Sequence, residues 1–214
     1  MNKDRKVILS IETSFEGGSI SILNEGIEID FWTGAKDVSK AEDVLAEIAK
    51  ILNRNKIDKK HIKLITVSNE FGSSTGVKIG LAIARGLGMA LGCEVFEKSI
   101  LEALSKNASG DNKGETVIIL PDGKDLFFLH QVNYFDSKIN IKNIKTANYK
   151  KEEFIAQLKL IKNSRIIFYQ KNFESYGHLF TGNIDSSNKI ILSDQIFATL
   201  IAKAVESEMG LIML

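Results

Sequence analysis

Short apolar stretches follow one another through the first half of the chain, each bounded by glycine or polar residues. Short runs of this kind predict strands, whereas apolar residues that recur every three or four positions predict helices. Strands are expected at 7–11, 18–23, about 28–33 and 64–69. Helices are expected at Ser39–Asn55, where Ser39 and Glu42 form a capping box, and from about Gly76 to Gly92. The first half therefore reads strand, strand, strand, helix, strand, helix.

The second half repeats this order in a reduced form. A short strand at 94–98 and a helix at 99–106 lead to the polar segment Asn107–Gly114, which is the best domain boundary in the sequence. Beyond it, strands are expected at 116–120, 126–135, 139–147 and 165–170, and helices at 150–161 and 194–208. We therefore expect two domains of the same α/β construction, residues 1–106 and 107–214.

This duplicated order resembles the actin, sugar kinase and Hsp70 superfamily, whose halves have an RNase H-like fold. In that superfamily, backbone amides of the first hairpin hold nucleotide phosphates, which points to the loop Glu12–Gly18 here. A second loop, Gly72–Gly76, ends at a helix N-terminus, where free amides favour an anion. The candidate nucleotide-binding residues are Glu12, Thr13, Ser14, Gly72, Ser73, Asp122 and Gly123. The structural alternatives are a hairpin turn, a helix cap by Ser74 or Thr75, and a tight turn at 121–124.

Small residues recur every four positions along the second helix, at Gly76, Gly80, Ala84, Gly88 and Gly92. They lie on one side of the helix. Because glycine within a helix costs roughly 1 kcal/mol relative to alanine, something must press closely against that side. Two neighbours satisfy this requirement: the sheet of the same domain, or a helix of a different chain.

The first helix has more apolar surface than one sheet requires. Val38, Ala41, Leu45, Ile48 and Leu52 have the spacing of a coiled-coil seam, and further apolar residues widen it. Either the helix is broadly buried in its own domain, or the two helices contribute to a bundle between chains. On the second interpretation the partner interface consists of Ala41, Leu45, Ile48, Leu52, Gly76, Gly80, Ala84 and Gly88.

Composition excludes several classes of protein. The 214 residues carry a net charge of +1, unlike the marked basic excess of a stand-alone nucleic-acid binder. The single cysteine excludes an internal disulfide, and no apolar run approaches the ~20 residues that span a bilayer. His61, His130 and His178 lie too far apart in sequence to form a local metal-binding pair. We therefore expect a cytoplasmic protein with no membrane segment and no metal site.

Three segments resemble the bacterial TsaB (YeaZ) family, within the Gcp-like group: Val7–Ser14, Gly72–Ala82 and Ser99–Leu104. The resemblance covers about residues 7 to 106. It implies a role in the threonylcarbamoyl modification of adenosine 37 in tRNAs that read codons beginning with A. It also implies a non-catalytic subunit, similar in fold to the enzyme TsaD but without its metal-binding histidines.

The same resemblance implies partners and cofactors. Such a subunit pairs with a TsaD-like protein as a heterodimer, through a bundle built from the first two helices, and forms a homodimer in isolation. A TsaE-like ATPase is a further partner, and contact with tRNA is only indirect. ATP or ADP with magnesium, at a shared complex interface, is the one cofactor that the resemblance leaves open.

Three segments depart from the family pattern. Glu12 stands where the family usually has aspartate, Glu70–Gly76 replaces a Gly-Pro-Gly-Ser-Phe-Thr-Gly loop, and residues 38–40 replace a His-Ser/Ala-Glu start of the first helix. These departures weaken the nucleotide site and admit a diverged paralogue. The alternative function is a small ATPase or phosphotransferase that holds its metal with Glu12 and Asp122.

Overall fold

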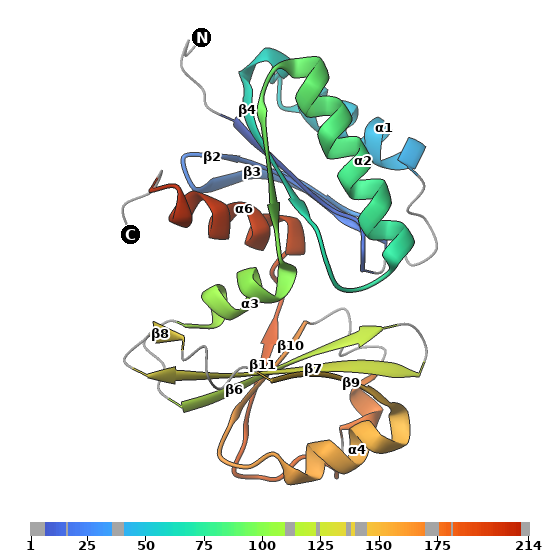
Figure 1. Ribbon diagram of the computed structural model, residues 1–214, viewed down its shortest axis with the longest axis vertical. Helices are drawn as coiled ribbons and strands as arrows, with labels where there is room; N and C mark the ends of the chain where they lie inside the picture. The colour runs from blue at the N-terminus through green and yellow to red at the C-terminus, as the bar shows by residue number, and fades with distance from the viewer. Residues whose placement is uncertain are drawn as a thin grey trace. The chain divides into compact units, whose positions relative to one another are not determined.

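The computed structural model describes residues 7–15, 17–35, 41–109, 114–122, 125–135, 138–139, 145–169, 176–180 and 182–210. The chain divides into two compact units (Figure 1). Unit 1 consists of Met1–Ala103 and Ile196–Leu214, and unit 2 consists of Leu104–Gln195. Each unit is built on one mixed sheet.

Unit 1 contains a five-stranded sheet in the order β3-β2-β1-β4-β5. Its strands are β1 (Val7–Glu12), β2 (Ser19–Asn24), β3 (Ile27–Thr33), β4 (Ile62–Ser68) and β5 (Glu94–Lys98). β1 pairs antiparallel with β2 through a hairpin and parallel with β4, which the chain reaches through a helix. The helical segments of this unit are α1 (Ala41–Arg54), the 3-10 turn η1 (Lys59–His61), α2 (Ser74–Leu91) and α6 (Phe197–Glu208).

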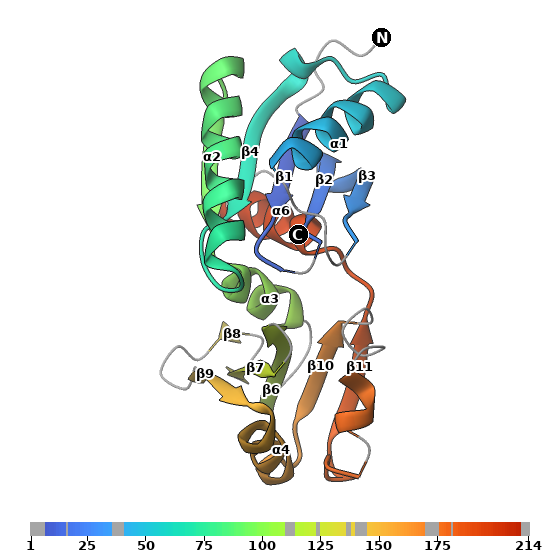
Figure 2. The ribbon, with the colours of Figure 1, turned by 90° about the vertical axis from the view of Figure 1, so that its right-hand side faces the viewer.

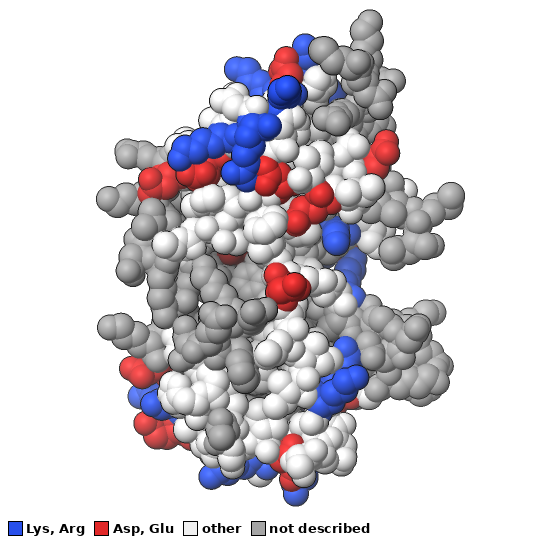
Figure 3. Space-filling view, turned by 180° about the vertical axis from the view of Figure 1, so that it is seen from behind, with Lys and Arg blue, Asp and Glu red and all other residues white. Residues whose placement is uncertain are grey.

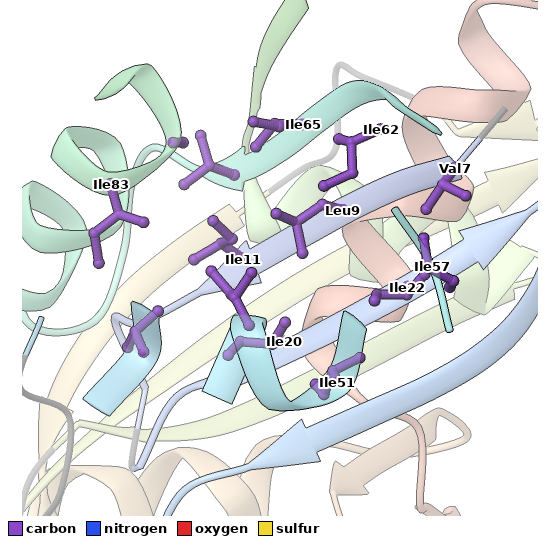
Figure 4. Close-up of a cluster of buried hydrophobic side chains, with 14 residues drawn as sticks. Val7, Leu9, Ile11, Ile20, Ile22, Ile51, Ile57, Ile62, Ile65 and Ile83 are labelled. Atoms are coloured by element: carbon purple, nitrogen blue, oxygen red, sulfur yellow. The ribbon is translucent and has the colours of Figure 1, made fainter. Parts of the chain in front are cut away.

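The alternation of side chains along β1 assigns the helices to the two faces of this sheet. Val7, Leu9 and Ile11 are fully buried and belong to a core cluster that includes residues of α1 and α2 (Figure 4). Ile8 points to the opposite face and belongs to a cluster with Ala202 of α6. The sheet is thus covered by α1 and α2 on one face and by α6 on the other (Figure 2).

Unit 2 contains a six-stranded sheet in the order β11-β10-β6-β7-β8, with β9 also paired to β7. Its strands are β6 (Gly114–Asp122), β7 (Leu126–Phe135), β8 (Lys138–Ile139), β9 (Lys145–Lys150), β10 (Arg165–Tyr169) and β11 (Lys189–Ser193). Its helical segments within the described residues are α4 (Lys151–Leu160) and the 3-10 turn η3 (Gly177–Leu179), and α3 (Ile100–Ser109) begins in unit 1 and ends in unit 2. α4 packs on the sheet through Phe154, whose ring stacks on that of Phe127 with centroids 4.3 Å apart.

Both sheets place an antiparallel hairpin beside parallel strands in the same order. β2-β1-β4-β5 in unit 1 corresponds to β7-β6-β10-β11 in unit 2. The duplicated α/β fold is therefore confirmed. Two details differ from the prediction: the strand expected at 139–147 consists of β8 and β9, with 140–144 outside the described residues, and β11 was not predicted. β11 is a short strand at the edge of its sheet, and its apolar run covers only residues 190–192, which is shorter than the run of about four or more residues that predicts a strand.

The closing helix belongs to a different unit from the one expected. Residues 107–214 are predicted as the second domain, but α6 lies in unit 1. The backbone N–H of Ala198 donates to the Ser19 hydroxyl at 3.1 Å, and the Thr199 hydroxyl donates to the Ser21 hydroxyl at 2.8 Å. These contacts join the two ends of the chain, so no local pattern in the sequence contains them.

The described helices are all modest in length. The longest, α2, has 18 residues, and α3 and α4 have 10 each. In this described part of the chain, no helix combines the length and the apolar character that crossing a membrane requires.

Candidate functional site

The two loops predicted as phosphate sites lie against each other in unit 1. β1 and β4 are neighbouring parallel strands, so the loops that follow them meet at one edge of the sheet. The backbone N–H of Ser73 donates to the carbonyl oxygen of Ser14 at 2.7 Å, and the Thr13 hydroxyl donates to the carbonyl oxygen of Gly76 at 2.7 Å. Gly72 has a φ of +81°, and a Cβ there would lie 2.5 Å from the Ser14 oxygen. The structure therefore brings these predicted residues together through contacts with one another.

Glu12 fills the first loop with its own carboxylate. Glu12 is 1% exposed, and its Oε1 accepts hydrogen bonds from the Ser14 backbone N–H at 2.5 Å, the Ser14 hydroxyl at 2.6 Å and the Phe15 backbone N–H at 3.1 Å. Burial raises the pKa of this carboxyl, and the hydrogen bonds from Ser14 and Phe15 act in the opposite direction. Two backbone amides that a phosphate in this loop would need are thus occupied by Glu12.

The N-terminus of α2 is likewise capped by a side chain of this protein. Ser73, rather than Ser74 or Thr75, is the N-cap, and its hydroxyl accepts from the backbone N–H of Gly76 at 3.3 Å. A Cβ at Gly76 would lie 2.0 Å from the carbonyl oxygen of Thr13. The helix-cap interpretation of this loop is therefore correct, although the capping residue differs.

The remaining nucleotide-binding candidates, Asp122 and Gly123, belong to unit 2. Asp122 is the last residue of β6 in unit 2, and its side chain and Gly123 lie outside the described residues. Within the described ranges, no three His, Cys, Asp or Glu residues gather as a metal site requires. Cys93 is half-buried, and burial raises the pKa of its thiol.

His130 in unit 2 is enclosed between two hydroxyl groups. Its Nε2 lies 2.8 Å from the Ser105 hydroxyl and its Nδ1 lies 2.8 Å from the Thr146 hydroxyl, so both ring nitrogens form hydrogen bonds. The residue is 4% exposed, and burial lowers the pKa of the imidazole to about 4. The ring is therefore neutral at pH 7 and links α3, β7 and β9 structurally.

The small-residue side of α2 faces its own sheet and loop. Ala84 is fully buried, a Cβ at Gly80 would lie 2.4 Å from the Thr13 hydroxyl oxygen, and a Cβ at Gly88 would lie 2.4 Å from a β5 side-chain carbon. The glycines therefore admit close approach of the helix to the sheet. The assignment of these residues, with Gly76, to a partner interface is corrected, because four-residue spacing predicts a close contact without identifying the neighbour.

On α1 the predicted seam is divided between core and surface. Ile48 is 4% exposed and lies in the core of unit 1, and Leu52 packs partly against that core. Leu45 is 44% exposed. The side chain of Ala41 lies outside the described residues. Of the predicted α1 residues whose side chains are described, Leu45 is therefore the one with an open surface.

The side of α1 and α2 that points away from the sheet is open and carries an apolar patch, with the exposed charges of Lys50, Lys78 and Arg85 beside it. Met89 is 87% exposed, and a Cβ added at Gly86 would meet no atom within 4 Å. We call this surface the outer face; it consists of Leu45, Ala46, Ala49, Ala82, Gly86, Met89 and Ala90, all exposed. The sequence pattern does not predict the α2 part of this face, because the longer glycine series marks the opposite side of the helix. The signal that could have found it is a second four-residue series, formed by Ala82, Gly86 and Ala90.

Comparisons of sequence identify relatives of the chain. A family model described as "TsaD: tRNA N6-adenosine threonylcarbamoyltransferase" matches residues 39–206. The "tRNA threonylcarbamoyladenosine biosynthesis protein TsaB" of Buchnera aphidicola subsp. Schizaphis graminum is 25% identical over 118 residues. That match covers 55% of this chain and 56% of the relative, so the chain spans about half the length of this curated relative.

Comparisons of structure give the same fold. YeaZ from Pseudomonas aeruginosa superposes with a TM-score of 0.63 over 96% of this chain and 93% of its own, at 16% identity. The activator of the 2-hydroxyisocaproyl-CoA dehydratase from Clostridium difficile, with bound ADPNP, superposes with a TM-score of 0.54 over 97% of this chain and 99% of its own, at 8% identity. At such low identity these likenesses establish the fold alone.

Proposed function

This chain belongs to the family of TsaD, the tRNA N6-adenosine threonylcarbamoyltransferase, with TsaB (YeaZ) proteins as its relatives, and on that premise we propose that it acts in tRNA threonylcarbamoyladenosine biosynthesis. In this proposal it is a non-catalytic subunit that pairs with a TsaD-type enzyme. The outer face of α1 and α2 is the pairing surface. The occupied loop at Glu12 supports this proposal over the ATPase alternative, because a phosphate would have to displace a buried carboxylate.

The observation that carries the proposal is the exposed glycine in the middle of α2. Gly76, Gly80 and Gly88 are each required by a neighbouring atom that a Cβ would approach within 2.4 Å. Gly86 has no such neighbour, although glycine inside a helix costs about 1 kcal/mol relative to alanine. Small residues at four-residue spacing allow the backbone of another helix to come close. A contact outside this chain would therefore account for Gly86.

Met89 supplies the apolar contact of this surface. Its side chain is 87% exposed beside Gly86, and burying a methionine fully contributes about 1.5–3 kcal/mol. On this proposal a TsaD-type protein covers Met89 in a heterodimer, and a second copy of the chain covers it in a homodimer when the partner is missing. In this proposal a TsaE-like ATPase is a further partner of the assembly, which acts in the cytoplasm.

Two matched substitutions test the pairing surface. Met89→Glu places a charge on the outer face, and Leu160→Glu places the same charge at a 71% exposed leucine of α4 in unit 2. Sedimentation of each variant with the TsaD-type protein of the same organism should give at least tenfold weaker association for Met89→Glu and native association for Leu160→Glu. Equal association of both variants would contradict the proposed surface.

A substitution on the small-residue side of α2 would be a poor test. A large side chain at Gly80 would collide with the Thr13 hydroxyl, since even a Cβ lies 2.4 Å from it. Loss of pairing in such a variant would then reflect damage to unit 1. Substitution at Gly86 avoids this problem because the position is open.

A further inference from the structure

Unit 1 contains a strongly basic stretch at residues 50–63, which we call the basic segment. It contains six Lys and Arg residues and one Asp. Its net charge of +5 leaves the other 200 residues with −4, since the whole chain has +1. The near-neutral total therefore conceals a strongly basic region. Figure 3 shows Lys and Arg side chains gathered over one end of unit 1.

The basic segment is held firmly in the fold. It runs from the last turns of α1 through η1 into β4, and Ile57 and Ile62 anchor it in the core at 6% and 2% exposure. Asp58 caps η1, because its side chain accepts from the backbone N–H of Lys60 at 3.0 Å. The pairing of β1 with β4 skips Lys63, so this residue forms a bulge and its side chain is exposed. The cations are thus displayed on a fixed backbone.

Half of these cations already have carboxylate partners. Lys50 pairs with Glu47 at 2.6 Å, Arg54 with Asp30 at 2.5 Å and Lys60 with Asp58 at 3.1 Å. The other three are Lys56, Lys59 and Lys63, all exposed. No ion pair joins any of these three to a carboxylate within the described ranges. They are available to an external anion.

We propose that Lys56, Lys59 and Lys63 bind the phosphate backbone of RNA. Lysines of a basic patch neutralise phosphates and release counterions, which supplies sequence-independent affinity. The basic segment contains no Phe, Tyr or Trp that could stack on a base, and its one imidazole, that of His61, is half-buried, so the contact is to the backbone. The inference rests on the proposed function, which makes tRNA the RNA concerned. It differs from the sequence-based expectation that contact with tRNA is only indirect.

The same residues do not fit a membrane surface. Segments that lie on a bilayer insert exposed apolar side chains beside their cations. Here the isoleucines nearest the lysines, Ile57 and Ile62, are buried in the protein core. A rigid display of cations without an insertable apolar side chain fits a polyanion in water.

The test measures RNA binding by the whole chain. Fluorescence anisotropy with labelled tRNA, at several salt concentrations, gives both the affinity and its salt dependence. The test variant combines Lys56→Gln, Lys59→Gln and Lys63→Gln, and the control combines Lys159→Gln, Lys162→Gln and Lys189→Gln, three exposed lysines of unit 2. The plot of log affinity against log salt has a negative slope, and losing three phosphate contacts should make it less steep by about 2–3. Binding should also weaken about tenfold to a hundredfold. The control should bind as the native chain does.

Three outcomes would overturn the proposal. The first is that the native chain does not bind tRNA at about 50 mM salt, and the second is that both variants lose the same affinity for tRNA. The third is that the three lysines are needed for binding to vesicles of anionic phospholipid but not for binding to tRNA. Circular dichroism of both variants checks that they are folded. Met89→Glu separates this proposal from the pairing surface. It should weaken association with the TsaD-type protein and leave binding of tRNA by the chain alone unchanged.

Discussion

Replacing glycine by alanine should have opposite effects on stability at different positions of α2. Within a helix, this change stabilises by about 1 kcal/mol when the new methyl group meets nothing. Gly86→Ala meets that condition, so we expect unit 1 to gain about 1 kcal/mol, or roughly 2–4 °C in Tm. Gly80→Ala and Gly88→Ala place a Cβ 2.4 Å from a side-chain atom, and overpacking of this kind costs about 1–3 kcal/mol. They should be neutral to destabilising by up to about 2 kcal/mol.

Gly76→Ala should be the most harmful of the four. Its Cβ would lie 2.0 Å from a backbone oxygen, that of Thr13, and backbone moves less readily than the end of a side chain. The loss should therefore reach or exceed the upper end of the overpacking range, about 3 kcal/mol.

Urea unfolding followed by tryptophan fluorescence measures these differences in unit 1. Trp32 is the single tryptophan of the chain, and it packs against the core of unit 1 from β3. Ala90→Gly on the exposed side of α2 is the inverse control, and it should lose about as much as Gly86→Ala gains. The measurement uses protein dilute enough to exclude self-association. If Gly86→Ala destabilises as much as Gly88→Ala, the outer face is not open and the reasoning fails.

Two further predictions concern buried ionisable groups. The pKa of His130 is about 4 in the folded chain and 6.5 when unfolded. As the pH falls from 6.5 toward 4, the unfolded chain binds a proton at His130 that the folded chain does not bind. The free energy of unfolding should therefore be unaffected by His130 above pH 6.5 and decrease by about 3 kcal/mol in all toward pH 4. Denaturation at pH 7 and 4.5, followed by circular dichroism, should show this loss in the native chain and a smaller one in His130→Gln; identical pH dependence of the two would contradict it. For Glu12, calorimetry of the native chain with ATP and magnesium should give no heat of binding, because the carboxylate occupies the amides of Ser14 and Phe15. Micromolar binding of ATP by the native chain would contradict the interpretation that Glu12 blocks this loop. Glu12→Gln, which keeps an acceptor oxygen, serves as the control for loop structure.

Local patterns were sufficient for most elements of the fold. The apolar runs of β1 and β4 and the helical spacing of α1 and α2 predicted these elements, because each one buries a side that the sequence repeats at a fixed period. The pattern was insufficient at β11, an edge strand whose apolar run is only three residues long. It was also insufficient for the candidate site, since the contact of Glu12 with Ser14 and Phe15 depends on how the loop turns.

By itself the sequence determined that two similar α/β halves follow one another, and that α2 requires a close neighbour on its small-residue side. Only the tertiary structure decided that this neighbour is the chain's own sheet and loop, that Gly86 and Met89 face outward, and that α6 returns to the first unit. The physical reason is that periodicity records which side of an element is buried. The identity of the burying surface depends on contacts between residues far apart in the chain, such as that of Ser19 with Ala198.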